Sequence, residues 1–263
     1  MAENYVSGTD YQVIESTAAV RQNAKSDSAL LTEALFGEVV TLYEENGGWG
    51  WGQLKSDEYV GYLPLHSLSP QINRPTHHVS VLRTYVYPAP DIKSPPLDLL
   101  SLNSQLCAAG AEGPFLQLKT GGFIISAHTS PKGEYAGDFV AIAENFAGTP
   151  YLWGGKTSLG LDCSGLVQLS LAACGKTVRR DSDMLQEQTG TEITITPELA
   201  GLQRGDLVFW SGHVGIMCDD RTIVHSNGFH MATVIEPLKL ARDRISSLFG
   251  EITTIKRLAD YPF

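Results

Sequence analysis

A glycine-rich segment followed by an apolar helix most constrains what this chain can fold into. Residues 151–155 read Tyr-Leu-Trp-Gly-Gly, which is unsuited to a helix interior, whereas residues 165–174 read as a mostly apolar helix. Asp162 and Cys163 stand just before that helix. The pattern therefore places a cysteine at a helix N-terminus, where unpaired amides and the helix dipole favour negative charge. We expect them to lower the pKa of the Cys163 thiol and to be able to hold an oxyanion.

Two histidines follow within a stretch that reads as three strands. Residues 205–210, 213–218 and 222–226 have the β-branched and aromatic content of strands. Alternation places His213 on one face of the second strand, and His225 lies across the hairpin, where cross-strand neighbours meet. A thiol and two imidazoles are the parts of a nucleophile, a base and an orienting group. The alternative is a small core cysteine with unrelated histidines.

These segments resemble the NlpC-type peptidase family, papain-like enzymes that cut peptidoglycan peptides. The resemblance runs from about residue 135 to the C-terminus and implies that Cys163 is the nucleophile, His213 the base and His225 the orienting residue. It also implies that the Tyr151 hydroxyl and the Cys163 amide form the oxyanion site, although Tyr151 could instead be a core residue. The motifs occur in family order: Tyr-Leu-Trp-Gly-Gly, Asp-Cys-Ser-Gly-Leu-Val, Arg-Gly-Asp-Leu-Val-Phe-Trp and His-Val-Gly-Ile.

The same resemblance implies a substrate groove. Asp162, Ser164 and Ser182 match positions that line it in the dipeptide-recognising branch of the family. We expect Asp162 to offer a carboxylate to a substrate ammonium, because a buried carboxylate needs a partner. Asp162 and Ser182 could instead be helix caps.

The region before residue 135 has short strand candidates separated by turns. Five short strands in about sixty residues suit a small closed barrel, and residues 35–40, 48–51 and 61–64 resemble a bacterial Src-homology-3-like barrel. A weaker second copy spans about residues 79–130. We therefore predict an α+β chain in which one or two all-β SH3-like barrels precede a papain-like cysteine peptidase domain. The predicted domains are a first barrel at 1–74, a second, divergent barrel at 75–134 and the peptidase domain at 135–263.

Two barrel residues are candidates for substrate binding. The resemblance implies that the first barrel closes the groove around the substrate amine. Tyr59 fits the barrel tyrosine of that branch, and Glu33 is the candidate for a second carboxylate. A solvated surface acid is the alternative for Glu33.

The net charge and the cysteine spacing limit which binding partners, metals and cofactors are expected. The formal net charge is −10, which argues against nucleic acid and anionic membranes, and we expect the Arg179-Arg180 pair to be a solvated surface feature. The four cysteines lack zinc-ligand or CxxC spacing, so neither a metal nor a cofactor is expected. Residues 1–8 lack a basic segment followed by an apolar core, so we expect no secretory signal and a cytoplasmic location.

The resemblance also implies a reaction. The family's cytoplasmic branch hydrolyses the γ-D-glutamyl-L-diamino acid bond (diaminopimelate or lysine) of small murein peptides with a free N-terminal L-alanine, in cell-wall peptide recycling. Three alternatives remain: an N-acetylmuramoyl-L-alanine amidase or general peptidoglycan hydrolase, an acyltransferase with the same thiol chemistry, and an inactive wall-binding protein. The presence of Cys163, His213 and His225 together argues against the last.

Overall fold

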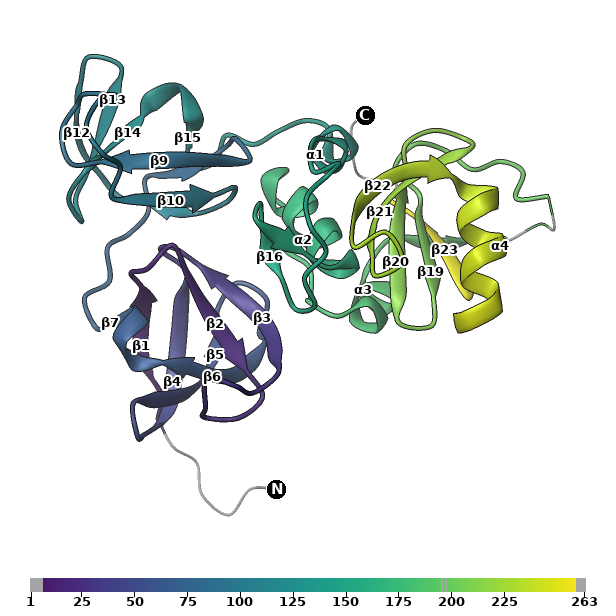
Figure 1. Ribbon diagram of the computed structural model, residues 1–263, viewed down its shortest axis with the longest axis horizontal. Coiled ribbons are helices and arrows are strands. Elements are labelled where there is room, and N and C mark those ends of the chain that lie inside the picture. Colours follow the sequence, from purple (N-terminus) through teal and green to yellow (C-terminus); the bar gives the residue numbers. More distant parts are fainter. Residues whose placement is uncertain (1–6, 195, 197, 259–263) are drawn as a thin grey trace. The chain divides into compact units, whose positions relative to one another are not determined.

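The structure is a computed structural model that describes residues 7–194, 196 and 198–258. The chain forms two compact units, Met1–Glu134 (unit 1) and Tyr135–Phe263 (unit 2) (Figure 1). Unit 1 is built from strands, whereas unit 2 combines helices with one large sheet. No helix in the described ranges is long and apolar enough to cross a membrane.

Unit 1 begins with a seven-stranded antiparallel sheet in the order β3-β2-β6-β5-β4-β1-β7. Alternate apolar side chains of these strands, among them Val20, Val40 and Leu63, form a buried core. The apolar pattern of the strand at 30–35 is weak, because Thr32 is buried and Glu33 is half-buried within it. The elements are β1 (Thr9–Val13), β2 (Thr17–Arg21), β3 (Leu30–Leu35), β4 (Val39–Asn46), β5 (Trp49–Leu54), β6 (Val60–Pro64), η1 (Leu65–Ser67) and β7 (Leu68–Ser69).

The rest of unit 1 contains a five-stranded sheet, β10-β9-β14-β13-β12, and a three-stranded sheet, β11-β8-β15. Their shared core includes Val79, Leu100, Leu116 and Ile124. The elements are β8 (His77–Val79), β9 (Arg83–Tyr87), β10 (Asp98–Ser101), β11 (Gln105–Leu106), β12 (Ala108–Glu112), β13 (Phe115–Leu118), β14 (Phe123–Ile125), η2 (Ser126–His128) and β15 (Thr129–Pro131). The predicted boundary between residues 74 and 75 stays a prediction.

The two parts of unit 1 meet at Phe36 and Gly37. Phe36 packs against the second core, and its carbonyl accepts a hydrogen bond of 2.8 Å from the Gln105 amide. Gly37 has φ +80, and a Cβ there would lie 2.2 Å from the Gln105 carbonyl oxygen. Glycine is therefore required both by the backbone conformation and by the close approach.

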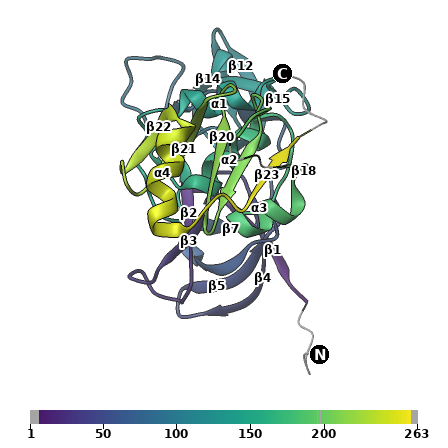
Figure 2. The ribbon, with the colours of Figure 1, turned by 90° about the vertical axis from the view of Figure 1, so that its right-hand side faces the viewer.

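Unit 2 is organised around a six-stranded antiparallel sheet in the order β18-β23-β19-β20-β21-β22. Helices α1 and α2 contact β20 on one side, and α4 contacts β22 and packs on the other side (Figures 1 and 2). The elements are α1 (Phe139–Asn145), β16 (Lys156–Thr157), β17 (Gly160–Leu161), α2 (Cys163–Ala173), α3 (Ser182–Gln188), β18 (Thr191–Ile193), β19 (Leu207–Trp210), β20 (His213–Met217), β21 (Thr222–Asn227), β22 (Ala232–Pro237), α4 (Leu238–Phe249) and β23 (Thr254–Arg257).

Strand alternation decides which residues face α4. Trp210, Met217 and Ile223 share a buried cluster with Ala241 and Ile245 of α4. Because alternate residues of a strand share a face, the same alternation turns His213 and His225 toward α4. The sheet thus presents both histidines on one side.

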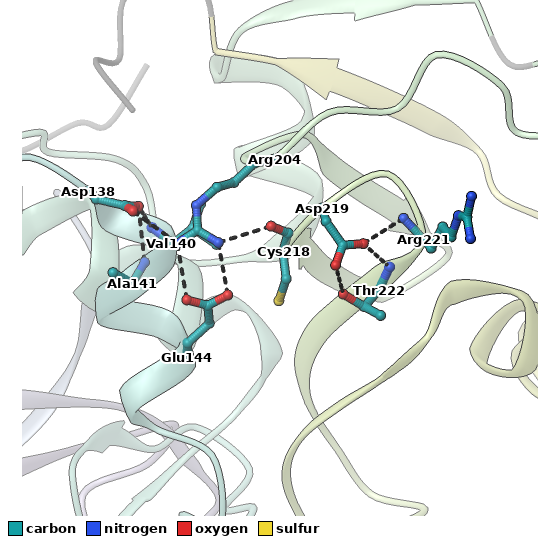
Figure 3. Close-up of polar contacts among 9 residues, drawn as sticks. All are labelled: Asp138, Val140, Ala141, Glu144, Arg204, Cys218, Asp219, Arg221 and Thr222. Carbon is teal, nitrogen blue, oxygen red and sulfur yellow. Dashed lines mark hydrogen bonds and ion pairs between the residues drawn. The ribbon is translucent and has the colours of Figure 1, made fainter.

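Arg204 ties the hairpin that carries the histidines to α1 (Figure 3). Its guanidinium donates to Asp138 Oδ2 at 2.9 Å, to Glu144 Oε1 at 2.8 Å and to the Cys218 carbonyl at 2.9 Å. Asp138 also caps α1, accepting from the amides of residues 140 and 141. One side chain therefore connects both ends of α1 to the end of β20.

Asp219 shapes the turn between β20 and β21 (Figure 3). Its carboxylate accepts three hydrogen bonds of 2.7 Å, from the Arg221 amide and from the amide and hydroxyl of Thr222. Such a side-chain-to-backbone turn fixes the strand that carries His225 relative to the one that carries His213.

Candidate active site

Cys163 is the first residue of α2, and Asp162 is the helix cap. The Asp162 side chain accepts a 2.8 Å hydrogen bond from the Gly165 amide, which satisfies one of the free amides of the helix start. Cys163 is 8% exposed, and the amides of Ser164 and Val214 hydrogen-bond to its sulfur. Because Val214 follows His213 directly, the thiol lies at the beginning of β20.

The thiol resists ionisation more than the sequence indicated. Burial raises the pKa of Cys163 to about 12, and the neighbouring Asp162 carboxylate acts in the same direction. The expected lowering is therefore wrong, because desolvation outweighs the two amides that favour the thiolate. At neutral pH the thiol keeps its proton until a base removes it.

His213 and His225 are in direct contact with each other. His213 Nε2 lies 2.8 Å from His225 Nδ1, and the two rings meet edge to face. A Cβ on Gly215 would lie 2.5 Å from Ile223 Cδ1 and 3.1 Å from His225 Cβ, so glycine leaves room for these two side chains. Burial, with a smaller effect of His225, lowers the pKa of His213 to about 3, so His213 is neutral and able to accept a proton.

A carboxylate follows His225. Glu236 Oε1 lies 2.8 Å from His225 Nε2. Arg244 of α4 holds the same carboxylate through two hydrogen bonds, of 2.5 Å to Oε1 and 3.0 Å to Oε2. Burial alone would raise the pKa of Glu236, but the hydrogen bonds from His225 and Arg244 hold it well below its usual range. Glu236 is therefore an anion.

A pocket of about 350 Å³ opens beside these residues. Tyr151 lines it, and burial, followed by the effect of Cys163, raises the Tyr151 pKa to about 12. The hydroxyl is therefore a hydrogen-bond donor at neutral pH, as an oxyanion site needs. Its other lining residues are Trp153, Cys163, Gly212, His213, Asn227, Gly228, Phe229, Arg244, Ile245 and Phe249.

Asp162 has a partner that the sequence reading missed. Arg180 Nη1 and Nη2 lie 2.9 and 2.8 Å from its two carboxylate oxygens, and the Gly154 amide adds a bond of 2.9 Å. Arg180 is 1% exposed, so its expected place as a solvated surface residue is wrong, whereas Arg179 is exposed. The Asp162 carboxylate is therefore already paired with a cation, and its contact with a substrate ammonium stays a prediction.

Comparison with known families decides what this arrangement is. Residues 148–242 match the NlpC/P60 family. Unit 2 is an NlpC/P60 domain. Residues 20–68 match the bacterial dipeptidyl-peptidase Sh3 domain. The predicted fold, a papain-like domain preceded by SH3-like structure, is confirmed, and the NlpC/P60 domain is a cysteine peptidase.

Individual relatives match different shares of the chain. Dipeptidyl-peptidase 6 of Lysinibacillus sphaericus is 35% identical over 103 residues, which is 39% of this chain but only 36% of that protein. The gamma-D-glutamyl-L-lysine dipeptidyl-peptidase of Bacillus cereus is 27% identical over 241 residues, covering 80% of this chain and 71% of the relative. The crystal structure of an NlpC/P60 family protein from Bacillus cereus shares the fold, with a TM-score of 0.78 at 20% identity over 97% of this chain and all of that one.

The remaining predicted substrate residues are placed as follows. The Ser164 hydroxyl is buried and bound to Arg180 and Asp162. Ser182 is the first residue of α3 and not its cap. Half-buried Tyr59 packs on the first core of unit 1, and Glu33 lies on β3. Their substrate roles stay predictions.

Three residues of the NlpC/P60 domain site escaped the sequence reading: Arg180, Glu236 and Arg244. Arg180 stands next to a true surface arginine, so composition could not separate the two. The sequence does contain a pattern that could have indicated Glu236 and Arg244. Residues 238, 241 and 245 are apolar at helical spacing, which indicates α4, and alternation along β22 places Glu236 on the face of His225.

Proposed function

We propose that this protein hydrolyses the γ-D-glutamyl-L-diamino acid bond of murein peptides that carry a free N-terminal L-alanine. One observation carries the proposal: the relative named gamma-D-glutamyl-L-lysine dipeptidyl-peptidase aligns over 80% of this chain, across both units. A second protein of that name, from Bacillus subtilis, aligns over 76% at 25% identity. We further infer that the peptides come from cell-wall turnover and are cleaved in the cytoplasm.

The site supports thiol chemistry on such a bond. The Cys163 sulfur attacks the γ-carbonyl of D-glutamate while its proton passes to His213. The Tyr151 hydroxyl and the Cys163 amide donate to the oxyanion. His213 then gives the proton to the leaving amine and afterwards takes one from water, which releases L-alanyl-D-glutamate from the thioester.

Arg180 already neutralises the Asp162 carboxylate, which is the proposed partner of the substrate amine. An added ammonium would therefore gain less from this carboxylate than from an unpaired one. We still propose a preference for the free amine, because the family resemblance implies a site that is closed on that side of the substrate. N-acetylation should lower kcat/KM by about 10²-fold, which corresponds to about 2.7 kcal/mol.

The test is mass spectrometry of the products from L-Ala-γ-D-Glu-L-Lys and L-Ala-γ-D-Glu-meso-diaminopimelate. Each is offered free, N-acetylated and linked to N-acetylmuramic acid, with the Cys163→Ala variant as the control. Release of L-Ala-D-Glu from the free peptides supports the proposal. Release of N-acetylmuramic acid would instead identify an amidase, and equal rates on free and N-acetylated peptides would indicate a general wall hydrolase. Intact peptides throughout would point to wall binding.

A further inference from the structure

We infer that Glu236 is a positioning residue of the peptidase site: held by Arg244, it sets where the protons lie in the His213–His225 pair. This inference rests on the proposed roles of Cys163 and His213 and is independent of which peptide is cleaved. It would extend the expected three-residue arrangement to a chain from Cys163 through two imidazoles to a carboxylate.

The carboxylate is enclosed by groups from three segments. His225 reaches it from β21, Arg244 from α4, and His230, from the connection between β21 and β22, lies 3.4 Å from Oε1. His225 is fully buried, and the Glu236 side chain is 12% exposed. Arg244 also lies 4.5 Å from the centre of the Phe229 ring, which fixes the guanidinium from the pocket side. Glu236 therefore has one defined orientation.

That orientation assigns the protons. An ionised carboxylate only accepts hydrogen bonds, so His225 Nε2 must carry a proton and donate it to Glu236 Oε1. Asn227 Nδ2 lies 3.2 Å from the same ring nitrogen, a longer contact than the 2.8 Å to the carboxylate. In neutral His225, Nδ1 is then an acceptor, and His213 Nε2 must donate to it. His213 Nδ1 is left without a proton, as the base for Cys163 requires.

The hydrogen bonds from His213 through His225 to Glu236 also stabilise the charge that forms during attack. When the Cys163 proton moves to His213 Nδ1, a thiolate and an imidazolium replace two neutral groups in a buried site. The imidazolium keeps its Nε2–H on His225, and Glu236 is the anion at the far end of that link. Arg244 makes Glu236 a poor base, so the carboxylate orients the histidines and leaves the transferred proton on His213, beside the leaving group.

The test uses Glu236→Gln, which keeps an oxygen for His225 but removes the charge, together with Glu236→Ala. The probe is iodoacetamide, and peptide mass spectrometry follows alkylation of Cys163 as a function of pH. The matched control is Asp243→Asn, which removes an exposed carboxylate paired with Lys239 on α4. Circular dichroism verifies that each variant is folded.

At neutral pH, Cys163 alkylation should fall about tenfold in Glu236→Gln and further in Glu236→Ala, a part of the 10²–10⁴-fold that proton transfer contributes. As the pH rises toward the raised pKa of the Cys163 thiol, about 12, hydroxide removes the proton without help from His213, and the difference between the wild type and Glu236→Gln should narrow. On a cleaved peptide, kcat should fall with little change in KM. Asp243→Asn should follow the wild type throughout.

Two outcomes would overturn the inference. One is a Glu236→Gln profile that superposes on that of the wild type. The other is full recovery in the double variant Glu236→Gln, Arg244→Met, because the loss would then come from the uncompensated arginine. A failure of the proposed function looks different: the free peptides would stay intact or give other products, whereas the effect of Glu236→Gln on Cys163 alkylation would remain.

Discussion

Arg180 and Asp162 form a two-point ion pair directly beside the nucleophile, with nitrogen–oxygen distances of 2.9 and 2.8 Å. Asp162 caps α2 and precedes Cys163, so the pair anchors the backbone that holds the thiol. Arg180 also donates to the Ser164 hydroxyl and to the Gly155 carbonyl. The buried guanidinium of Arg180 thus joins the glycine-rich segment to the start of α2 through hydrogen bonds.

Arg180→Met should lower the free energy of unfolding by about 3–5 kcal/mol, because it leaves the Asp162 carboxylate buried without its cation. Urea unfolding checks this. Arg179→Met is the matched control, since Arg179 is the exposed neighbour, and it should change stability by less than about 0.5 kcal/mol. Equal effects of the two substitutions would contradict the assignment of Arg180 as the anchor.

Cys163→Ala should abolish peptide hydrolysis while the protein stays folded. In the wild type, iodoacetamide should modify Cys163 before Cys107, Cys174 and Cys218, because His213 assists its ionisation. Burial raises the pKa of Cys174 to about 11 and of Cys218 to about 12, and neither has a place in the proposed proton transfer. Cys107→Ser should keep full activity. Uniform labelling of all four thiols would remove the nucleophile assignment.

His213→Ala should be nearly as damaging as loss of the thiol, because the base and the acid are lost together. His225→Ala should retain a little activity, and His225→Asn should be about tenfold more active than His225→Ala, since an amide oxygen can accept the His213 Nε2–H. Steady-state rates on one tripeptide decide this. An asparagine variant no better than alanine would argue against an orienting role.

Acid should destabilise the fold through the histidine pair. Burial holds the pKa of His213 and of His225 below the unfolded value of about 6.5, so the unfolded chain binds more protons there than the folded chain. The sign follows: stability is fully present above about pH 6.5 and falls as the pH drops toward 5, by at most about 1.4 kcal/mol per pH unit for each group.

Urea unfolding between pH 7 and about pH 5, a window in which ordinary carboxylates stay ionised, measures that slope. His225→Asn should reduce the slope, whereas His66→Asn, a change at an exposed histidine of unit 1, should leave it unchanged. A slope that survives His225→Asn intact would assign it to other groups.

Much of the site could be read from local pattern. The helix start at Cys163 and the strands of His213 and His225 follow from glycine, apolar runs and alternation, and the structure has them at 163–173, 213–217 and 222–227. Long-range pairing could not be read in this way. Arg180 is buried because a carboxylate 18 residues earlier needs it, and Glu236 matters because α4 brings Arg244 onto it. The raised pKa of Cys163 could not be predicted from the sequence either, because desolvation of the thiol depends on how the whole domain packs.

The anchor at Arg180 has a consequence for the chain during synthesis. Cys163 is translated before the arginine that secures its helix and long before the two histidines and Glu236. A ribosome-bound chain that has emerged only as far as α2 therefore carries a thiol without its base and a cap without its counter-charge. The parts of the proposed proton-transfer chain therefore come together only after synthesis has passed Arg244, the last of them in the sequence.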